Sequence, residues 1–313
     1  MSWGGEHGVR ISLSAVVMAL RSGRLCALTT ETADGELALP FGPFDPANDR
    51  TFERALRAFV TAQTGFTLGF VEQLYTFGDA GRDAPRATPG PDRRREISVG
   101  YLALTTDAVD MTPPGARWTS VLELFPWEDR RGSGQAAQGV IAAGLMQWAA
   151  GDARRLARIE ALFATGPSQR WDEARVLERF ELLYEAGLVA EAARDREDAC
   201  PLPLGDRPMA SDHRRILATG LGRLRSKLRY RPVLFELTPE TFTLSELQAA
   251  AEAVVALSLH KQNFRRGVER TGLVAATGRL STGTGGRPAE LFRYTGASNS
   301  DGQAAGLALP ALR

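Results

Sequence analysis

Near the end of the chain, the pattern of apolar and polar positions predicts a helix, a turn and a second helix. Thr243 and Glu246 have the spacing of a capping box, in which each side chain accepts a hydrogen bond from the other residue's backbone N–H. Apolar residues then recur at helical spacing: Leu244, Leu247, Ala251 and Val254. Ser258 is the expected N-cap of the second helix, residues 259–271, which ends before Gly272. Each helix should therefore bury one face.

The second helix has two chemically different faces. Phe264 and Val268 lie on one face, and cationic or amide side chains lie on the opposite face or beside it: Lys261, Gln262, Asn263, Arg265, Arg266 and Arg270. Guanidinium and amide groups hold phosphates and form bidentate contacts with base edges in the major groove. The second face therefore has the chemistry of a DNA-recognition helix.

Two short segments after this helix, 273–277 and 289–294, are able to pair as a hairpin around a Gly-rich loop. Two helices and a hairpin in this order predict a winged helix-turn-helix, with the second helix in the major groove and the hairpin against the backbone or minor groove. The expected DNA contacts are Thr243, Ser245, Lys261, Gln262, Asn263, Arg265, Arg266, Arg270 and, in the wing loop, Arg287. The alternative is a solvated helix and a surface hairpin in another kind of α/β protein.

The rest of the chain divides into a strand-rich part and a helical part. Apolar and β-branched runs predict strands over residues 9–20, 24–30, 68–77 and 96–105, with one helix over 51–64. Helical periodicity follows over residues 136–150, 152–163, 172–193 and 213–228, the last capped by Asp212. Strands around one helix favour an α/β sandwich. The predicted domains are a sandwich (8–128), a helical insertion or linker (129–208), the winged helix-turn-helix (209–295) and a disordered tail (296–313).

Charge is unevenly distributed along the chain. The 313 residues have a formal net charge of +1, whereas residues 212–294 contain 14 Lys and Arg against 7 Asp and Glu. Such an asymmetry indicates a polyanion-binding module joined to a part of opposite charge. There is no membrane-length apolar run and no signal-peptide pattern, and Cys26 and Cys200 indicate neither a disulfide framework nor a zinc site. We therefore expect a cytoplasmic protein without a membrane partner.

Four motifs follow one another along the chain: Leu74–Asp83, Lys227–Pro232, Asn263–Arg266 and Gly286–Ala289. Through them the chain resembles the Nudix-related transcriptional regulators of NAD metabolism, over residues 9–294. Tyr184–Val189 and His260–Asn263 are similar to the alphaproteobacterial branch of that family. The resemblance implies an α/β Nudix-like sandwich that binds an NAD-related nucleotide. It also implies a winged helix that represses genes of NAD biosynthesis or salvage.

One departure from the family pattern concerns catalysis. A working Nudix box carries an Arg-Glu pair and two further Glu on one helix, and these carboxylates hold divalent ions. Aligned on Gly65, the four positions hold Ala58, Phe59, Ala62 and Gln63. We therefore expect a protein that is not an enzyme, with no metal site and no required cofactor. The residues expected at the rim of the nucleotide pocket are Phe77, Gly78, Arg82 and Asp83.

These observations together predict a homodimeric repressor that binds double-stranded operator DNA and a small nucleotide effector of the NAD, ADP-ribose or ATP type. A dimer is expected because two recognition helices related by a two-fold axis read a palindrome. One alternative is a Nudix-type ADP-ribose or NAD pyrophosphatase with a basic accessory domain, which the altered box disfavours. The other is an RNA-binding module, for which the basic segments lack interleaved aromatic residues.

Overall fold

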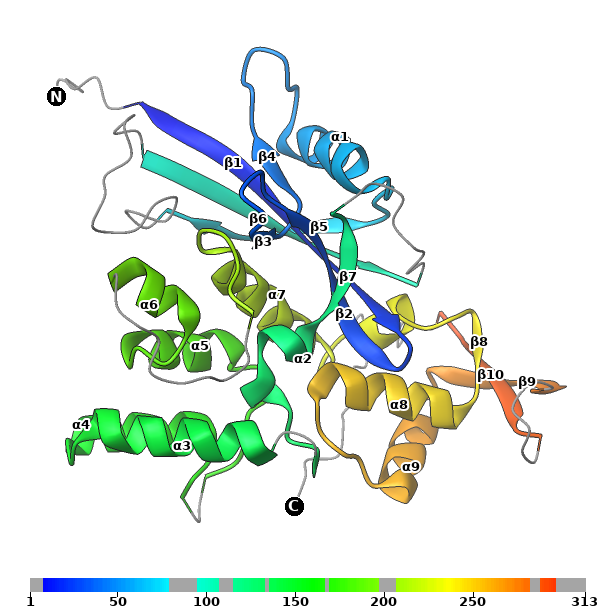
Figure 1. The fold of residues 1–313 in the computed structure, drawn as a ribbon. Coiled ribbons are helices and arrows are strands. Elements are labelled where there is room, and N and C mark those ends of the chain that lie inside the picture. The colour runs from blue at the N-terminus through cyan, green and yellow to red at the C-terminus, as the bar shows by residue number, and fades with distance from the viewer. Residues whose placement is uncertain are drawn as a thin grey trace, which may run out of the picture.

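The computed structural model has a seven-stranded sheet in the N-terminal part of the chain (Figure 1). It describes residues 8–78, 95–106, 115–132, 135–166, 169–196, 207–281 and 288–296. The strands of this sheet are β1 (Val9–Arg21), β2 (Arg24–Glu31), β3 (Leu37–Ala38), β4 (Phe41–Pro43), β5 (Val71–Phe77), β6 (Arg95–Thr105) and β7 (Arg117–Ser120). Their order is β3-β2-β1-β6-β5, with β4 also paired to β1 and β7 to β2. Only the β1–β6 pair is parallel among the described strands.

A helix packs on each face of the sheet. Alternate residues of β1 point to opposite sides, so each face presents its own apolar residues to a helix. Leu13 and Val17 pack in the smaller core with α1 (Phe52–Thr64). Val16 packs in the larger core with α7 (His213–Lys227), on the other face (Figure 1). The strand–helix sandwich expected for the N-terminal part is therefore present.

Helix α7 lies against the sheet, although the sequence-based division assigns it to the winged helix-turn-helix domain. A Cβ atom at Gly220 would stand 2.8 Å from Cγ1 of Val16, so only glycine allows this close approach of helix and strand. The predicted N-cap, Asp212, makes no side-chain capping bond to the helix. Helix α7 thus joins the sandwich to the C-terminal domain, and the predicted domain boundaries stay a prediction.

The segment between the sheet and α7 is helical, as expected. It contains α2 (Val121–Leu124), the 3-10 turn η1 (Pro126–Glu128), α3 (Gln135–Ala149), α4 (Ala153–Phe163), α5 (Val176–Glu185) and α6 (Ala190–Arg196). The single helix predicted over 172–193 is wrong, because this stretch forms α5 and α6. Gly187 has φ of 75° and ends the first of them, in a left-handed conformation that glycine adopts at little cost. Asp172 lies before α5 and accepts a hydrogen bond from the Ala174 N–H at 3.1 Å.

The C-terminal domain has the predicted order of elements. Helix α8 (Leu244–Val255) is followed by α9 (Lys261–Thr271), β9 (Val274–Leu280) and β10 (Glu290–Tyr294). The capping box is confirmed: the Thr243 N–H donates to Glu246 Oε2 at 2.7 Å, and the Glu246 N–H donates to Thr243 Oγ1 at 3.1 Å. Gly272, with φ of 65°, ends α9 as predicted.

Two local features of this domain differ from the prediction. Ser258 is not the N-cap of α9, because the helix starts at Lys261 and His260 occupies the cap position without a side-chain capping bond. A third strand, β8 (Thr241–Phe242), pairs with β10 and gives the order β8-β10-β9. Two residues are too few for an alternating pattern, so the sequence carries no clear signal for this strand.

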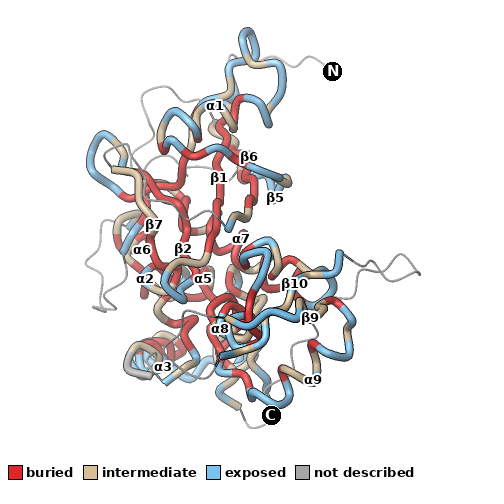
Figure 2. The backbone as a smooth tube through the Cα atoms, turned by 90° about the vertical axis from the view of Figure 1, so that its right-hand side faces the viewer, coloured by how far each residue is buried: buried red, intermediate tan, exposed pale blue. Residues whose placement is uncertain are grey.

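Buried residues run continuously from the sheet through α7 to α8 (Figure 2). The larger core includes Val16 of β1, Leu217 of α7, Leu247 of α8 and Phe264 of α9. The winged helix therefore shares a core with the rest of the protein. Within the described parts of the chain, no helix has the length and apolar character needed to cross a bilayer. The expected tail beyond residue 296 lies outside the described residues.

Candidate functional site

The exposed face of α9 gathers cationic and amide side chains. Phe264 and Val268 are each 1% exposed and anchor the helix on the core. The predicted contact residues on the other face are exposed, except Arg265, which is half-buried: Lys261, Gln262, Asn263, Arg265, Arg266 and Arg270. Across the described ranges, no acidic side chain forms an ion pair with any of these cations. Their charges are therefore available to an external anion.

The start of α8 brings two further predicted contact residues to the same domain. Thr243 is 6% exposed, and its hydroxyl already accepts the capping hydrogen bond. Ser245 is exposed on the first turn. A serine hydroxyl here can donate to a phosphate oxygen, whereas Thr243 mainly shapes the helix start. The DNA-contact role of both residues stays a prediction.

The wing is held by aromatic packing and presents two arginines that the sequence analysis did not select. Tyr294 stacks on Phe235 with ring centroids 4.4 Å apart, which attaches β10 to the core. Arg279 on β9 and Arg293 on β10 are exposed. The predicted wing contact, Arg287, lies outside the described residues. Arg293 follows the buried-side Phe292 in an alternating strand, and this pattern was the signal available in the sequence.

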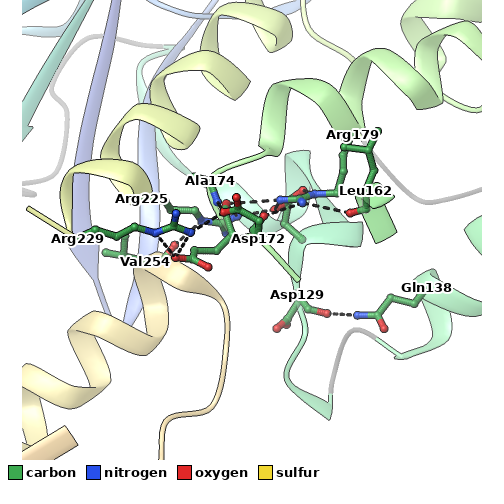
Figure 3. A network of polar contacts seen from close by, with 11 residues as sticks. Asp129, Gln138, Leu162, Asp172, Ala174, Arg179, Arg225, Arg229 and Val254 are labelled. Carbon is green, nitrogen blue, oxygen red and sulfur yellow. Dashed lines mark hydrogen bonds and ion pairs between the residues drawn. The ribbon is translucent and has the colours of Figure 1, made fainter. Parts of the chain in front are cut away.

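A buried charge cluster lies where the sandwich, the helical segment and the winged helix meet (Figure 3). Glu128 is 0% exposed and accepts from Arg179 Nε at 2.6 Å and Nη2 at 2.9 Å. Arg225 of α7 is 1% exposed; it forms an ion pair with Glu128 and donates from Nε to the Val254 carbonyl at 2.8 Å. Burial alone raises the pKa of Glu128, but the two guanidinium groups together hold it below its usual value.

The same junction includes backbone and surface contacts. The Arg130 N–H donates to the Ala256 carbonyl at 3.0 Å, so two carbonyls at the end of α8 are bound to the rest of the chain. Arg229, just after α7, forms ion pairs with Asp172 at 2.5 Å and Glu173 at 2.9 Å. The position of α8 relative to the sandwich is thus fixed by polar contacts as well as by the shared core.

The Nudix-box positions on α1 do not fit a divalent ion. Ala58 and Ala62 are exposed, and Phe59 is half-buried; none of them carries an oxygen ligand. The Gln63 side chain accepts from the Phe41 N–H at 3.2 Å and donates to the Phe41 carbonyl at 2.6 Å, so the backbone uses both ends of its amide. Glu53 forms an ion pair with Arg57 at 2.8 Å. Among the described residues, no group of three or more His, Cys, Asp or Glu is placed to hold a metal.

A small cavity lies beside this helix. It has a volume of about 170 Å³ and is lined by Thr30, Glu31, Phe41, Gln63, Gly115 and Ala116. Of the predicted pocket residues, Phe77 is 7% exposed and packs in the larger core, so its ring does not line this cavity. Gly78 follows it at the end of β5, and Arg82 and Asp83 lie outside the described residues. The ligand-binding role of these residues stays a prediction.

Comparison with known proteins agrees with the arrangement of the C-terminal domain. Residues 234–294 match the NrtR DNA-binding winged helix domain. The ADPR responsive transcriptional repressor NtrR of Acinetobacter baylyi is 38% identical over 86 residues, which are 28% of this chain and 34% of that protein. The matched stretch therefore spans about a third of the length of that relative.

Solved structures show the same overall fold. NrtR of Shewanella oneidensis, in a complex with a 27mer DNA, superposes with a TM-score of 0.52 at 21% identity, over 91% of this chain and 93% of that chain. A MutT/nudix family protein from Enterococcus faecalis gives a TM-score of 0.55 at 12% identity, over 94% and 89%. The predicted fold class, a Nudix-like sandwich with a helical segment and a C-terminal winged helix, is confirmed. The predicted resemblance to Nudix-related regulators is confirmed as well.

Proposed function

We propose that this protein is a transcriptional repressor that binds operator DNA through α9 and the wing, and that its Nudix-like domain senses an NAD-related nucleotide. The observation that carries the proposal is the exposed Arg and amide face of α9, without internal ion-pair partners in the described chain. It stands in a segment that matches a DNA-binding winged helix family. Genes of NAD biosynthesis or salvage are the proposed targets, because the sequence motifs resemble regulators of that metabolism.

The test of DNA binding uses the purified full-length chain and the DNA upstream of its own gene. A scrambled duplex of the same length and composition is the control. The repressor hypothesis expects saturable binding that prefers the upstream duplex and weakens as salt is raised, because phosphate contacts release counterions. Equal binding to both duplexes would reject operator recognition.

ADP-ribose is the first effector to test. The relative from Acinetobacter baylyi is named as ADPR responsive, which supports this choice over other nucleotides. The cavity beside α1 offers the polar groups of Thr30 and Glu31 and the ring of Phe41 as contacts for part of such a ligand. Calorimetric titration with ADP-ribose, NAD and ATP compares the three ligands directly. The sensor hypothesis fails if none of them binds.

Helix α7 is the proposed link between effector and DNA. At its start, His213 accepts at Nδ1 from the Leu39 N–H at 3.2 Å and packs edge-on against the ring of Phe41, which lines the cavity. Near its end, Arg225 binds the last turn of α8. A ligand that shifts Phe41 can therefore act through a rigid helix on the winged helix. We expect ADP-ribose to weaken DNA binding by about 1 to 3 kcal/mol, and DNA to weaken ADP-ribose binding by the same factor.

Hydrolysis is not part of the proposed function. Ala58, Phe59 and Ala62 offer no carboxylate, and Gln63 is engaged with the backbone, so no divalent ion is held as in a working box. The purified protein with Mg²⁺ or Mn²⁺ should therefore release no AMP from ADP-ribose or NAD. A turnover of about 1 per second, within the range of ordinary enzymes, would instead support the pyrophosphatase alternative. Loss of that turnover in Glu53→Gln would locate it on α1.

The functional unit is proposed to be a homodimer. Two recognition helices must meet half-sites about one helical turn apart, which one chain with one α9 cannot do. Sedimentation of the free protein and of its DNA complex gives the stoichiometry. Two chains per duplex with a palindromic footprint are expected, and one chain per duplex would reject the dimer.

A further inference from the structure

The start of α9 is held by an arrangement other than a helix cap. His260 occupies the cap position without a side-chain capping bond, and Ser258 is exposed. Yet this end of the helix carries Lys261, Gln262 and Asn263, and the first residues of a recognition helix are those that reach base edges. Something else must set the angle at which the first turn leaves α8.

Two side chains of α8 bind both polar groups of the Leu259 backbone. Glu252 Oε1 accepts from the Leu259 N–H at 2.8 Å. Gln248 Nε2 donates to the Leu259 carbonyl at 2.9 Å and also to Glu252 Oε1 at 3.0 Å. Gln248 and Glu252 are four residues apart and so lie on one face of α8. We call this arrangement the Gln248–Glu252 clamp.

We propose that the Gln248–Glu252 clamp positions α9 for base recognition, an inference that rests on the proposed DNA-binding function. Leu259 is two residues before the helix, so a rotation of its peptide groups changes where Lys261 and Gln262 point. The apolar anchors Phe264 and Val268 set the depth of the helix in the core. They lie further along the helix, whereas its start is held at Leu259, which is 7% exposed in the larger core and whose backbone N–H and carbonyl are bound by the clamp.

The charge of Glu252 supports a geometric role. A carboxylate in a domain that attracts a polyanion lowers the affinity for DNA by repulsion, so it has a cost for the proposed function. Its oxygen accepts a charge-assisted hydrogen bond from the Leu259 N–H, which is stronger than a neutral one. Gln248 is suited to the other position, because an amide donates to both a carbonyl and a carboxylate.

The experiment compares the unmodified chain with three variants on two duplexes. The first duplex is selected by the unmodified protein from a random-sequence pool, and the second is its scrambled form. The variants are Gln248→Glu, Glu252→Ala and Glu252→Gln. Glu252→Gln is the matched control, because it loses the same charge as Glu252→Ala but keeps an oxygen that accepts from the Leu259 N–H. Thermal unfolding identifies the temperature range in which each variant is folded.

We expect Gln248→Glu and Glu252→Ala to lose about tenfold or more of the preference for the selected duplex, which is the size of one misplaced base contact. Glu252→Gln should keep that preference. The ratio of the two affinities distinguishes positioning from stability, because a merely less stable variant retains the same ratio while it is folded. If Glu252→Ala does not fold, Gln248→Glu decides the question.

An unchanged ratio in Gln248→Glu, or equal losses in Glu252→Ala and Glu252→Gln, would overturn the clamp. In either case the unmodified protein still prefers its selected duplex, so the proposed function survives. If the unmodified protein selects no duplex at all, the proposed function fails, and the clamp fails with it.

Discussion

Helices α7 and α9 are both rich in cationic side chains, but their charges meet different partners. Four cations of α7, and Arg229 two residues after it, form ion pairs with acids that precede α7 in the sequence. The pairs are Arg214 with Glu191, Arg215 with Glu181, Arg225 with Glu128, Lys227 with Glu72, and Arg229 with Asp172 and Glu173. The cations of α9 have no such partner in the described ranges.

This difference changes the meaning of the charge asymmetry along the chain. The excess of Lys and Arg in residues 212–294 combines two populations, and most cations of α7 neutralise acids that precede them in the sequence. Among the described residues of this stretch, the cations without an ion pair therefore lie mostly in α9 and on the wing strands. Counting charges by sequence position overstates the polyanion-binding surface, because long-range ion pairs are invisible to the count.

The largest effect expected from this comparison is on stability. Arg225→Ala removes one partner from a buried charge cluster and should lower the free energy of unfolding by about 3 to 5 kcal/mol. Arg223→Ala is the matched control, since this exposed residue of α7 has no ion pair in the described chain; its effect should stay within about 0.5 kcal/mol. Urea unfolding of both variants measures the difference. Similar values for the two would contradict a structural role for the buried cluster.

The same cluster predicts a dependence of stability on pH. Because Arg179 and Arg225 hold the pKa of Glu128 below its ordinary value of 4.5, its contribution is complete above that pH. The contribution is lost as the pH falls through the lower pKa of the folded state. The difference in unfolding free energy between the unmodified protein and Glu128→Gln should be constant at neutral pH and should shrink on acidification below about pH 4.5. A difference that grows on acidification would mean that the pKa of Glu128 is raised, and not lowered, in the folded protein.

Substitutions on the exposed face of α9 should affect DNA binding and not stability. Arg266→Ala or Gln262→Ala should leave stability nearly unchanged and weaken operator binding by about 1 to 3 kcal/mol, with relaxed preference at one base pair. Binding to a panel of single-base operator variants measures both quantities. Equal losses on operator and random DNA would reassign the residue to phosphate contact.

The smallest expected effect concerns the wing. Arg279→Ala should reduce the slope of log affinity against log salt by about 1, because one phosphate contact is lost without any base contact. Arg287→Ala should behave in the same way if the sequence-based assignment of the wing loop holds. A slope that neither substitution alters would remove the wing from the DNA interface.

The sequence by itself determined helix ends and helix faces, because these depend on interactions between residues that are close together in the chain. The capping box at Thr243, the end of α9 at Gly272 and the two faces of α9 follow from side chains within a few residues of each other. The N-cap of α1 at Thr51 and the left-handed Gly65 after it are also local. Apolar and β-branched runs likewise located four of the seven strands, β1, β2, β5 and β6, because β1 and β2 are buried on both faces and so read as continuous apolar runs. The short strands β3, β4 and β7 were not predicted.

Only the tertiary structure decided features that depend on distant residues. The division of 172–193 into two helices at the left-handed Gly187 is not of this kind: it is a local signal that the prediction passed over in favour of a continuous apolar stripe. Three contacts join residues that are far apart in the sequence. Gln63 binds the Phe41 backbone, Gly220 approaches Val16 closely, and Glu128 pairs with Arg179 and Arg225. An arginine has the same chemistry in α7 and in α9; burial and the nearest carboxylate determine whether it stabilises the fold or faces a ligand.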